Sequence, residues 1–145
     1  MTGDRFIDFA RKLLVQYKND PAGVRSTVSR LYYGAYHIGI SLLTELGWPP
    51  VANENGHQHA QRAFQNSGEQ NAIEFGDLLV QLHERRKQAD YKLHDERYES
   101  SRFGEEAVVR LDQALRAFQK CCNEPARTNI KAGISSYREK INSPR

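Results

Sequence analysis

The chain has 145 residues, 39% of them hydrophobic and 27% charged, which is a composition typical of a single globular domain with a buried core. Its mean hydropathy is −0.74, and no apolar run approaches the roughly 20 residues that a membrane-spanning helix needs. The N-terminus has no apolar signal-peptide core, so we expect a cytoplasmic protein without membrane contact. A net charge of +3 permits contact with nucleic acid but does not require it.

Apolar residues recur at helical spacing through most of the chain, and Pro and Gly interrupt the pattern between segments. The pattern predicts helices over about residues 4–18, 24–46, 57–65, 70–93, 103–122 and 127–141. The segments between them are predicted to be a turn at 19–23, a polar loop at 51–56 and a charged turn at 95–101. No alternating β-branched run is present. We therefore predict an all-α fold: an up-down helical bundle of about five helices in residues 1–124, with a C-terminal amphipathic extension in residues 125–145.

Most of the predicted helices carry an apolar stripe that would face the core, and in the fifth helix this stripe is Val108, Leu111, Leu115 and Phe118. In the first helix this stripe is Phe6, Phe9, Ala10, Leu13, Leu14 and Tyr17. In the fourth it is Phe75, Leu78, Leu79, Leu82, Ala89 and Leu93. In the last it is Ile130, Ile134, Tyr137 and Ile141, despite the low helix propensity of Gly133. The last helix either packs on its own bundle or docks a partner protein.

The second predicted helix has an unusual polar face. Its apolar stripe is Val28, Leu31, Ala35, Ile38, Leu42 and Leu46, and nearly opposite lie Ser26, Arg30, Tyr33, His37, Ser41 and Thr44. A surface helix normally carries Lys and Glu on such a face. Here Arg30, Tyr33 and His37 project from successive turns of one side. This face is either a packing feature satisfied by neighbouring helices or one half of a polar site between helices.

The fourth predicted helix has two charges where apolar residues are expected. Arg85 and Arg86 lie angularly inside its apolar stripe, and a charge facing a core costs free energy unless it is paired. Asp90 follows Arg86 by four residues, so its carboxylate can reach the guanidinium on the same side. One interpretation is a partly buried ion pair at the edge of the bundle. The other is an arginine that holds a phosphate beside a cleft, with Asp90 fixing its orientation.

No metal or other cofactor is predicted. His57 and His59 do not have the spacing of metal ligands on a helix, and no Cys or carboxylate cluster accompanies them. The adjacent Cys121 and Cys122 cannot form a relaxed disulfide with each other, so we expect reduced thiols near a helix end. The chain also has no Gly-rich phosphate loop and no G-x-S-x-G elbow. Any catalysis would use Arg, His, Tyr and Asp side chains on helices, which suits phosphodiester chemistry better than acyl transfer.

Three strings resemble those of a known family. SRLYYGAYH, residues 29–37, resembles the S-R-x-Y-Y-x-x-[FY]-H signature of HEPN-domain proteins, and looks closest to their small stand-alone prokaryotic branch. HQHAQRAF, residues 57–64, is similar to that branch's H-x6-F helix, and RKQADY, residues 86–91, resembles its R-x-x-A-D-Y element. The three strings occur in the right order and lie within roughly residues 26–122.

The resemblance implies an all-α bundle around two long antiparallel helices and frequent dimerisation. It also implies a role in RNA-directed toxin–antitoxin or defence systems, often beside a minimal nucleotidyltransferase. In catalytic HEPN proteins an R-x4-6-H motif cleaves RNA without metal, at paired sites across a dimer cleft. Here the position five after Arg86 is Tyr91, and His94 lies eight after Arg86, outside that spacing. A phenol, which ionises near pH 10, is a poor general base at neutral pH, whereas Arg86 would still bind phosphate.

These observations lead to one principal hypothesis: a HEPN-like protein that binds RNA or a nucleotide between its second and fourth helices. The residues assigned to phosphate or nucleic-acid binding are Arg30, Tyr33, His57, Arg86 and Asp90. Those assigned to any catalytic step are Arg86, His37 and Tyr91. In this scheme the arginines contact phosphate, the tyrosines offer stacking faces, and His37 is the proton carrier, because histidine titrates near neutral pH.

Two alternatives remain open from the sequence. The first is a metal-independent endoribonuclease in which His37 or His94 replaces the motif histidine. The second is a module that interacts only with proteins, as a homodimer that docks a nucleotidyltransferase. In that case the polar faces would fix helix register, and residues 127–141 would be the docking segment.

Overall fold

The computed structural model describes residues 1–51 and 55–143 and is built from six α-helices. They are α1 (Gly3–Tyr17), α2 (Pro21–Glu45), α3 (Gly56–Gln65), α4 (Gln70–Tyr91), α5 (Ser101–Cys121) and α6 (Ala126–Asn142), with a short 3-10 turn, η1 (Glu96–Tyr98). The described residues contain no strand, so the predicted all-α bundle is confirmed. Residues 52–54 of the predicted polar loop lie outside the described residues.

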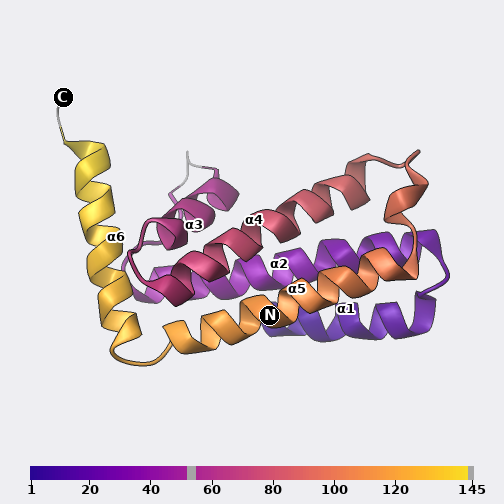
Figure 1. Ribbon diagram of the computed structural model, residues 1–145, viewed down its shortest axis with the longest axis horizontal. Coiled ribbons are helices and arrows are strands. Elements are labelled where there is room, and N and C mark those ends of the chain that lie inside the picture. The colour runs from indigo at the N-terminus through magenta and orange to yellow at the C-terminus, as the bar shows by residue number, and fades with distance from the viewer. Residues whose placement is uncertain (52–54, 144–145) are drawn as a thin grey trace.

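The helix α2 is the centre of the bundle. It packs against α1, α4 and α5, while α3 lies beside α4 and α6 crosses one end of the assembly (Figure 1). Its fully buried side chains include Val24, Val28, Leu31, Tyr32, Ala35 and Leu43. Because almost every side of α2 is covered, its exposed part between the two end turns is a narrow polar stripe: Ser26, Arg30, His37, Ser41 and Thr44. The prediction that this helix has a buried apolar face and an opposite polar face is therefore confirmed.

The start of α2 differs from the prediction by one turn. Pro21 was expected to break the helix, yet it occupies the first helical position, and the Asp20 side chain caps the helix by accepting a 2.9 Å hydrogen bond from the Ala22 amide. Proline is compatible with this position because its missing N–H would have no partner in the first turn and its fixed φ is helical. The predicted boundary at residue 24 was therefore too late.

The face that α1 buries also differs from the predicted stripe. Ile7 and Ala10 are buried, whereas the Phe9 and Tyr17 side chains are 54% and 42% exposed. The reason is a close approach of α1 to α2 at Gly34, where an added Cβ would lie 2.5 Å from Ile7 Cγ1. Small residues allow this contact, and the larger aromatic residues stay toward solvent. Periodicity alone could not separate two stripes roughly 100° apart on one helix.

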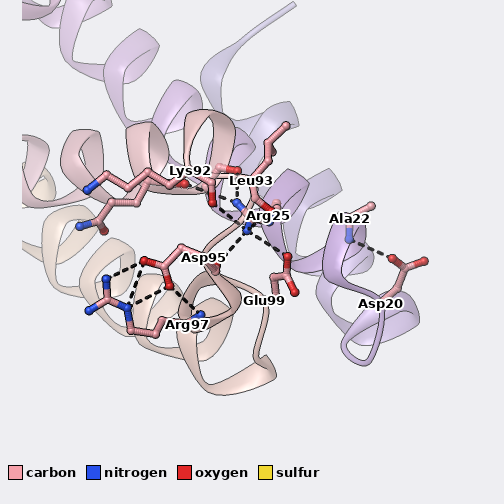
Figure 2. A network of polar contacts seen from close by, with 10 residues as sticks. Asp20, Ala22, Arg25, Lys92, Leu93, Asp95, Arg97 and Glu99 are labelled. Atoms are coloured by element: carbon pink, nitrogen blue, oxygen red, sulfur yellow. Dashed lines mark hydrogen bonds and ion pairs between the residues drawn. The ribbon is translucent and has the colours of Figure 1, made fainter.

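A buried arginine ends α4 (Figure 2). Arg25, on α2, donates hydrogen bonds to the carbonyl oxygens of Ala89 (2.8 Å), Lys92 (3.1 Å) and Asp95 (3.0 Å), and to Glu99 Oε1 (3.0 Å). Carbonyls at the end of a helix have no partners within it, so the guanidinium satisfies groups that would otherwise be buried without partners. The charged turn predicted at 95–101 is folded around this side chain.

The predicted end of α4 was consequently wrong by two residues. The helix ends at Tyr91, and Lys92 has ψ of 62°, outside the helical region. Leu93, which was predicted to lie on the apolar stripe, is 62% exposed. The carbonyl oxygens of residues 92 and 95 turn toward Arg25, and this turn directs the intervening side chains outward.

The C-terminal helix packs on its own bundle through its first half. Ile130 and Ile134 are fully buried, while Ile141 at the far end is 55% exposed. Between the two buried residues, the backbone at Gly133 lies so close to the turn between α3 and α4 that an added Cβ would be 1.6 Å from the Ser67 carbonyl oxygen. The predicted division into residues 1–124 and 125–145 stays a prediction.

Because of this contact, we expect a glycine-to-alanine substitution at residue 133 to destabilise the protein, although the same substitution normally stabilises a helix. Alanine is favoured over glycine by about 1 kcal/mol in a helix interior. We nevertheless expect Gly133→Ala to lower the free energy of unfolding by about 2 kcal/mol, because the methyl group must displace a backbone carbonyl rather than a flexible side chain. Urea denaturation measures the change. The matched control is Ala132→Gly on the exposed side of α6, which should cost only its helix propensity, and a stabilised Gly133→Ala protein would contradict the packing.

Two further sequence predictions concern membranes and thiols. Within the described residues, no helix combines the length and apolar character required to cross a bilayer. Cys121 is buried at the end of α5 and Cys122 is exposed, and both are free thiols, as predicted. Burial raises the pKa of the Cys121 thiol to about 12, so this sulfur stays protonated at neutral pH.

Candidate functional site

Arg86 connects α4 to α2. Its Nη2 atom donates a 2.6 Å hydrogen bond to Tyr33 Oη, and its Nε atom lies 2.9 Å from Asp90 Oδ2. The same carboxylate oxygen accepts a 3.1 Å hydrogen bond from Ser29 Oγ on α2. The Arg86 side chain is only 14% exposed. The predicted Arg86–Asp90 ion pair is therefore formed, and it joins two helices rather than stabilising one.

The ion pair leaves part of the guanidinium unsatisfied. The contact from Nε to Asp90 is close but poorly aligned, so Nε is the one buried side-chain nitrogen or oxygen without a hydrogen-bond partner among the described residues. A short charge–charge distance without a directed hydrogen bond is weaker than the bidentate geometry that arginine and carboxylate can form. The Arg86 charge is thus offset by Asp90 while some of its hydrogen-bonding capacity remains unused.

Guanidinium groups and aromatic rings alternate around Arg86. Its Cζ atom lies 5.1 Å from the Tyr33 ring centroid and 5.4 Å from that of Tyr91. Arg30 Cζ lies 6.0 Å from the Tyr33 centroid and 5.8 Å from that of Phe6 on α1. These distances are within the range of cation–π attraction. Tyr91, at one end of the series, is 70% exposed; at the other end Arg30 is exposed beside the half-buried Phe6.

His37 lies at the edge of the same group. Its exposed ring stacks on Phe6 at a centroid distance of 5.8 Å and lies 6.5 Å from the Tyr33 ring. The structure thus brings together all of the residues predicted on the second and fourth helices. We call the assembly the Arg86 cluster: Phe6, Arg30, Tyr33, His37, Arg86, Asp90 and Tyr91. Phe6 belongs to it because the close approach of α1 turns this ring toward the polar face of α2.

A layer of imidazole and phenol rings supports the cluster from within. Tyr32 Oη forms a short hydrogen bond with His57 Nδ1, and the His57 and His83 rings stack at a centroid distance of 4.6 Å. His83 also stacks on Tyr32 at 4.8 Å and interacts with Gln61 Nε2 through Nδ1 at 3.1 Å. Sequence reasoning missed Tyr32 and His83. Tyr32 was within the SRLYYGAYH string, and His83 precedes Arg86 by one helical turn.

The two histidines in this layer are held neutral. Burial lowers the pKa of His57, and the positive charge of Arg86 adds to the effect. Burial and the neighbouring His57 lower the pKa of His83 to about 4. A neutral imidazole does not attract phosphate as a cation would. His57 is half-buried and hydrogen-bonds Tyr32, and its predicted role in phosphate binding stays a prediction.

The lowered pKa of His83 predicts a pH-dependent stability. As the pH falls, the unfolded chain takes up this proton near pH 6.5, while the folded chain resists it until about pH 4. The free energy of unfolding therefore falls between pH 6.5 and pH 4, by about 1–2 kcal/mol after allowance for solvent screening. His83→Asn, which keeps an acceptor near the Nδ1 position, should flatten the curve in this window.

Urea denaturation at several pH values measures this dependence. The control is His94→Asn, which removes an exposed imidazole in the loop after α4 and should follow the wild-type curve. A His83→Asn curve parallel to wild type between pH 6.5 and pH 4 would show that the stability change comes from other groups.

His94 does not join the cluster. It is exposed beyond the end of α4, in a shallow hollow lined by residues 91–97. None of the hydrogen bonds or ring contacts of the described residues links it to Arg86. Within the same residues, no group of three or more His, Cys, Asp or Glu side chains is arranged to hold a metal ion.

Comparison of the chain with family models, curated proteins and solved structures finds no match. The resemblance to HEPN-domain proteins therefore stays a prediction that depends on the three short strings. An all-α bundle is compatible with many activities, whereas the chemistry of the Arg86 cluster is specific to this chain.

Proposed function

We propose that this protein is a HEPN-like helical protein that binds RNA through the Arg86 cluster, in a prokaryotic toxin–antitoxin or defence system. The observation that carries the proposal is the alternation of two guanidinium groups with three aromatic rings, from Tyr91 on α4 to Phe6 on α1. Arginine supplies phosphate contacts, and aromatic rings supply faces on which bases stack. The combination suits unpaired nucleotides, whose bases are free to leave their own stack.

The charges of the cluster support an anionic ligand. Arg30 is exposed, and no carboxylate of the described residues forms an ion pair with it. Asp90 offsets the charge of Arg86 only. The cluster therefore carries a net positive charge at its surface before any contribution from His37. Arg30 and Tyr91 are the exposed cation and the exposed phenol of the cluster, so a ligand meets these two side chains first.

Fluorescence anisotropy with a labelled single-stranded RNA of about 12 nucleotides tests this proposal. We expect Arg30→Ala and Tyr91→Ala each to weaken binding about tenfold, because each removes one phosphate or base contact and both side chains are exposed. The control is Arg116→Ala, an equal charge change on the exposed side of α5. Loss of affinity that is the same in Arg116→Ala, or a wild-type protein that does not bind, would contradict the proposal.

A second candidate function is metal-independent cleavage of the bound RNA. His37 favours it, because this exposed imidazole lies beside Tyr33, which Arg86 contacts. A general acid or base must reach the reacting oxygen, and only a histidine at the surface of the cluster meets that condition. Cleavage of single-stranded RNA in EDTA should then disappear in His37→Ala and persist in His94→Ala. RNA that stays intact with the wild-type protein would remove this function.

We also propose, from the family resemblance, a homodimer that works beside a nucleotidyltransferase. Exposed apolar side chains on α1, including Phe9 (54%) and Val15 (81%), support a further protein contact. The exposed end of α6 near Ile141 is a second surface of this kind. Light scattering after size exclusion tests the dimer, and a constant mass near 16.6 kDa at all concentrations would contradict it.

A further inference from the structure

The second half of α6 stands beside α3 at one end of the bundle (Figure 1). The first half of α6 is fixed to the bundle, because Ile130 and Ile134 are fully buried and the Gly133 backbone lies against the turn between α3 and α4. The last turns of α6 are therefore held in a defined position, although the Ile141 side chain is 55% exposed. Together with α3 they enclose a groove.

The groove between α3 and α6 has a buried floor. His59 and Ala63 form this floor from one face of α3, and they are only 7% and 3% exposed. His59 is fixed in place, because its Nε2 atom lies 3.0 Å from the Trp48 carbonyl oxygen. Tyr137 and Ile141, one helical turn apart, line the α6 side and give that side an apolar surface.

The rim of the groove is cationic. Arg62, on α3, is exposed and forms no ion pair with a carboxylate of the described residues. Arg138, on α6, is half-buried, and its Cζ atom lies 5.5 Å from the Trp48 ring centroid. None of the described residues that line the groove is an Asp or a Glu. An occupant that carries carboxylates therefore meets complementary charge on both sides of the groove.

The volume of the groove decides between kinds of occupant. It is about 210 Å³, below the range of about 300–1,000 Å³ that is usual for small-molecule and cofactor sites. One or two side chains of a protein segment fit this space. A helix that lies in a groove inserts such side chains from one face, and carboxylates one turn away on the same face then reach the rim.

A second copy of this chain is a poor occupant. In a two-fold interface the same surface meets itself, so Arg62 and Arg138 of one protomer would face the same two cations of its partner. Like charges placed opposite each other oppose association. The charge of the groove thus favours a different, acidic protein.

We propose that the α3–α6 groove docks an acidic amphipathic helix of a partner protein. One apolar side chain of that helix lies against Tyr137 and Ile141, and neighbouring carboxylates bind Arg62 and Arg138. Arginine suits this role because its planar fork pairs with a carboxylate through two parallel hydrogen bonds. The proposal does not depend on RNA binding by the Arg86 cluster, whose residues lie on α1, α2 and α4.

Fluorescence anisotropy of the full chain with a labelled peptide of about 16 residues tests this surface. The peptide is built from Ala, Leu and Glu, with Leu at i, i+3, i+4 and i+7, and a second peptide of equal charge has Ser in place of Leu. We expect Arg62→Ala to weaken binding of the Leu peptide about tenfold and Ile141→Ser about fivefold. The matched controls Arg116→Ala and Val109→Ser alter exposed side chains of α5 and should bind it as the wild type does.

Nuclear magnetic resonance of the isotopically labelled protein locates the peptide, which should shift the amide signals of α3 and of residues 137–141. Thermal melting confirms that each variant is folded. Equal affinity for the Ser peptide would show that charge alone attracts it and would overturn docking in the groove. An affinity unchanged in Arg62→Ala, or no binding of the Leu peptide by the wild type, would remove the site.

RNA is the other anion that the same variants test. Arg62→Ala that loses affinity for single-stranded RNA and keeps its affinity for the Leu peptide would assign the groove to nucleic acid and contradict the proposal. Arg30→Ala should keep the wild-type affinity for the peptide. A loss of RNA affinity in Arg30→Ala alone tests the Arg86 cluster, so the two proposals can fail separately.

Discussion

Arg25→Ala should lower the free energy of unfolding by about 3–5 kcal/mol. We expect this loss to be larger than that of any other single substitution on the side of α2 that faces α4. The side chain is only 9% exposed and donates to three carbonyl oxygens and one carboxylate within 3.1 Å. Alanine would leave these acceptors buried without donors, at about 1–3 kcal/mol for each that water cannot reach. It would also leave the Glu99 carboxylate half-buried without its cation.

The loss is measured by urea denaturation followed by circular dichroism. Arg25→Lys is the matched control, because it keeps the charge but has three donors on one atom and cannot reach acceptors on two sides (Figure 2). We expect it to recover less than half of the stability. Hydrogen exchange should show the last turn of α4 opening first in both variants. An Arg25→Ala protein within about 1 kcal/mol of wild type would show that the network contributes little.

Arg86→Ala is expected to lower the free energy of unfolding by about 2–3 kcal/mol and the melting temperature by about 6–10 °C. Arg86 bridges α4 to Tyr33 on α2 and lies against Asp90, whose side chain is 28% exposed. Removing the guanidinium leaves that carboxylate partly buried, with the Ser29 hydroxyl as its one hydrogen-bond donor among the described residues. Arg86→Met combined with Asp90→Asn removes both charges and should recover part of the stability.

The same variant separates the binding proposal from a purely structural role. If the Arg86 cluster binds RNA, Arg86→Ala loses affinity for RNA at temperatures where the variant is fully folded, by about tenfold. If the polar faces only fix helix register, the melting temperature falls while the affinity for RNA stays that of the wild type. Arg86→Lys should retain more RNA affinity than alanine, because a point charge still attracts phosphate.

Local pattern predicted the helices of this protein well and their ends less well. Helical spacing and turn residues were sufficient for six helices in the right order, because each is amphipathic or bounded by Pro and Gly. The end of α4 depends on Arg25, more than 60 residues away in the sequence, and no local signal marks that contact. The buried face of α1 depends on Gly34 of another helix. Both are tertiary effects that override a local pattern.

The residues of the candidate site were predictable for a simple reason. Arg30, Tyr33 and His37 share one face of α2, Arg86 and Asp90 share one face of α4, and these neighbouring helices bring the two faces together. The supporting layer was harder to predict, because Tyr32 and His83 look like ordinary buried residues in sequence. Arg85 pairs with Glu106 of α5 at 3.6 Å, and these two charges face each other only in the folded chain.

The salt dependence of RNA binding tests the central claim most directly. For a single strand, the logarithm of the association constant falls with the logarithm of salt concentration by about 0.7 for each phosphate that the protein neutralises. If Arg30 contacts a phosphate, the slope for Arg30→Ala should be shallower than that of the wild type by about 0.7, while Arg116→Ala keeps the wild-type slope. Parallel lines for wild type and Arg30→Ala would contradict phosphate recognition by the Arg86 cluster.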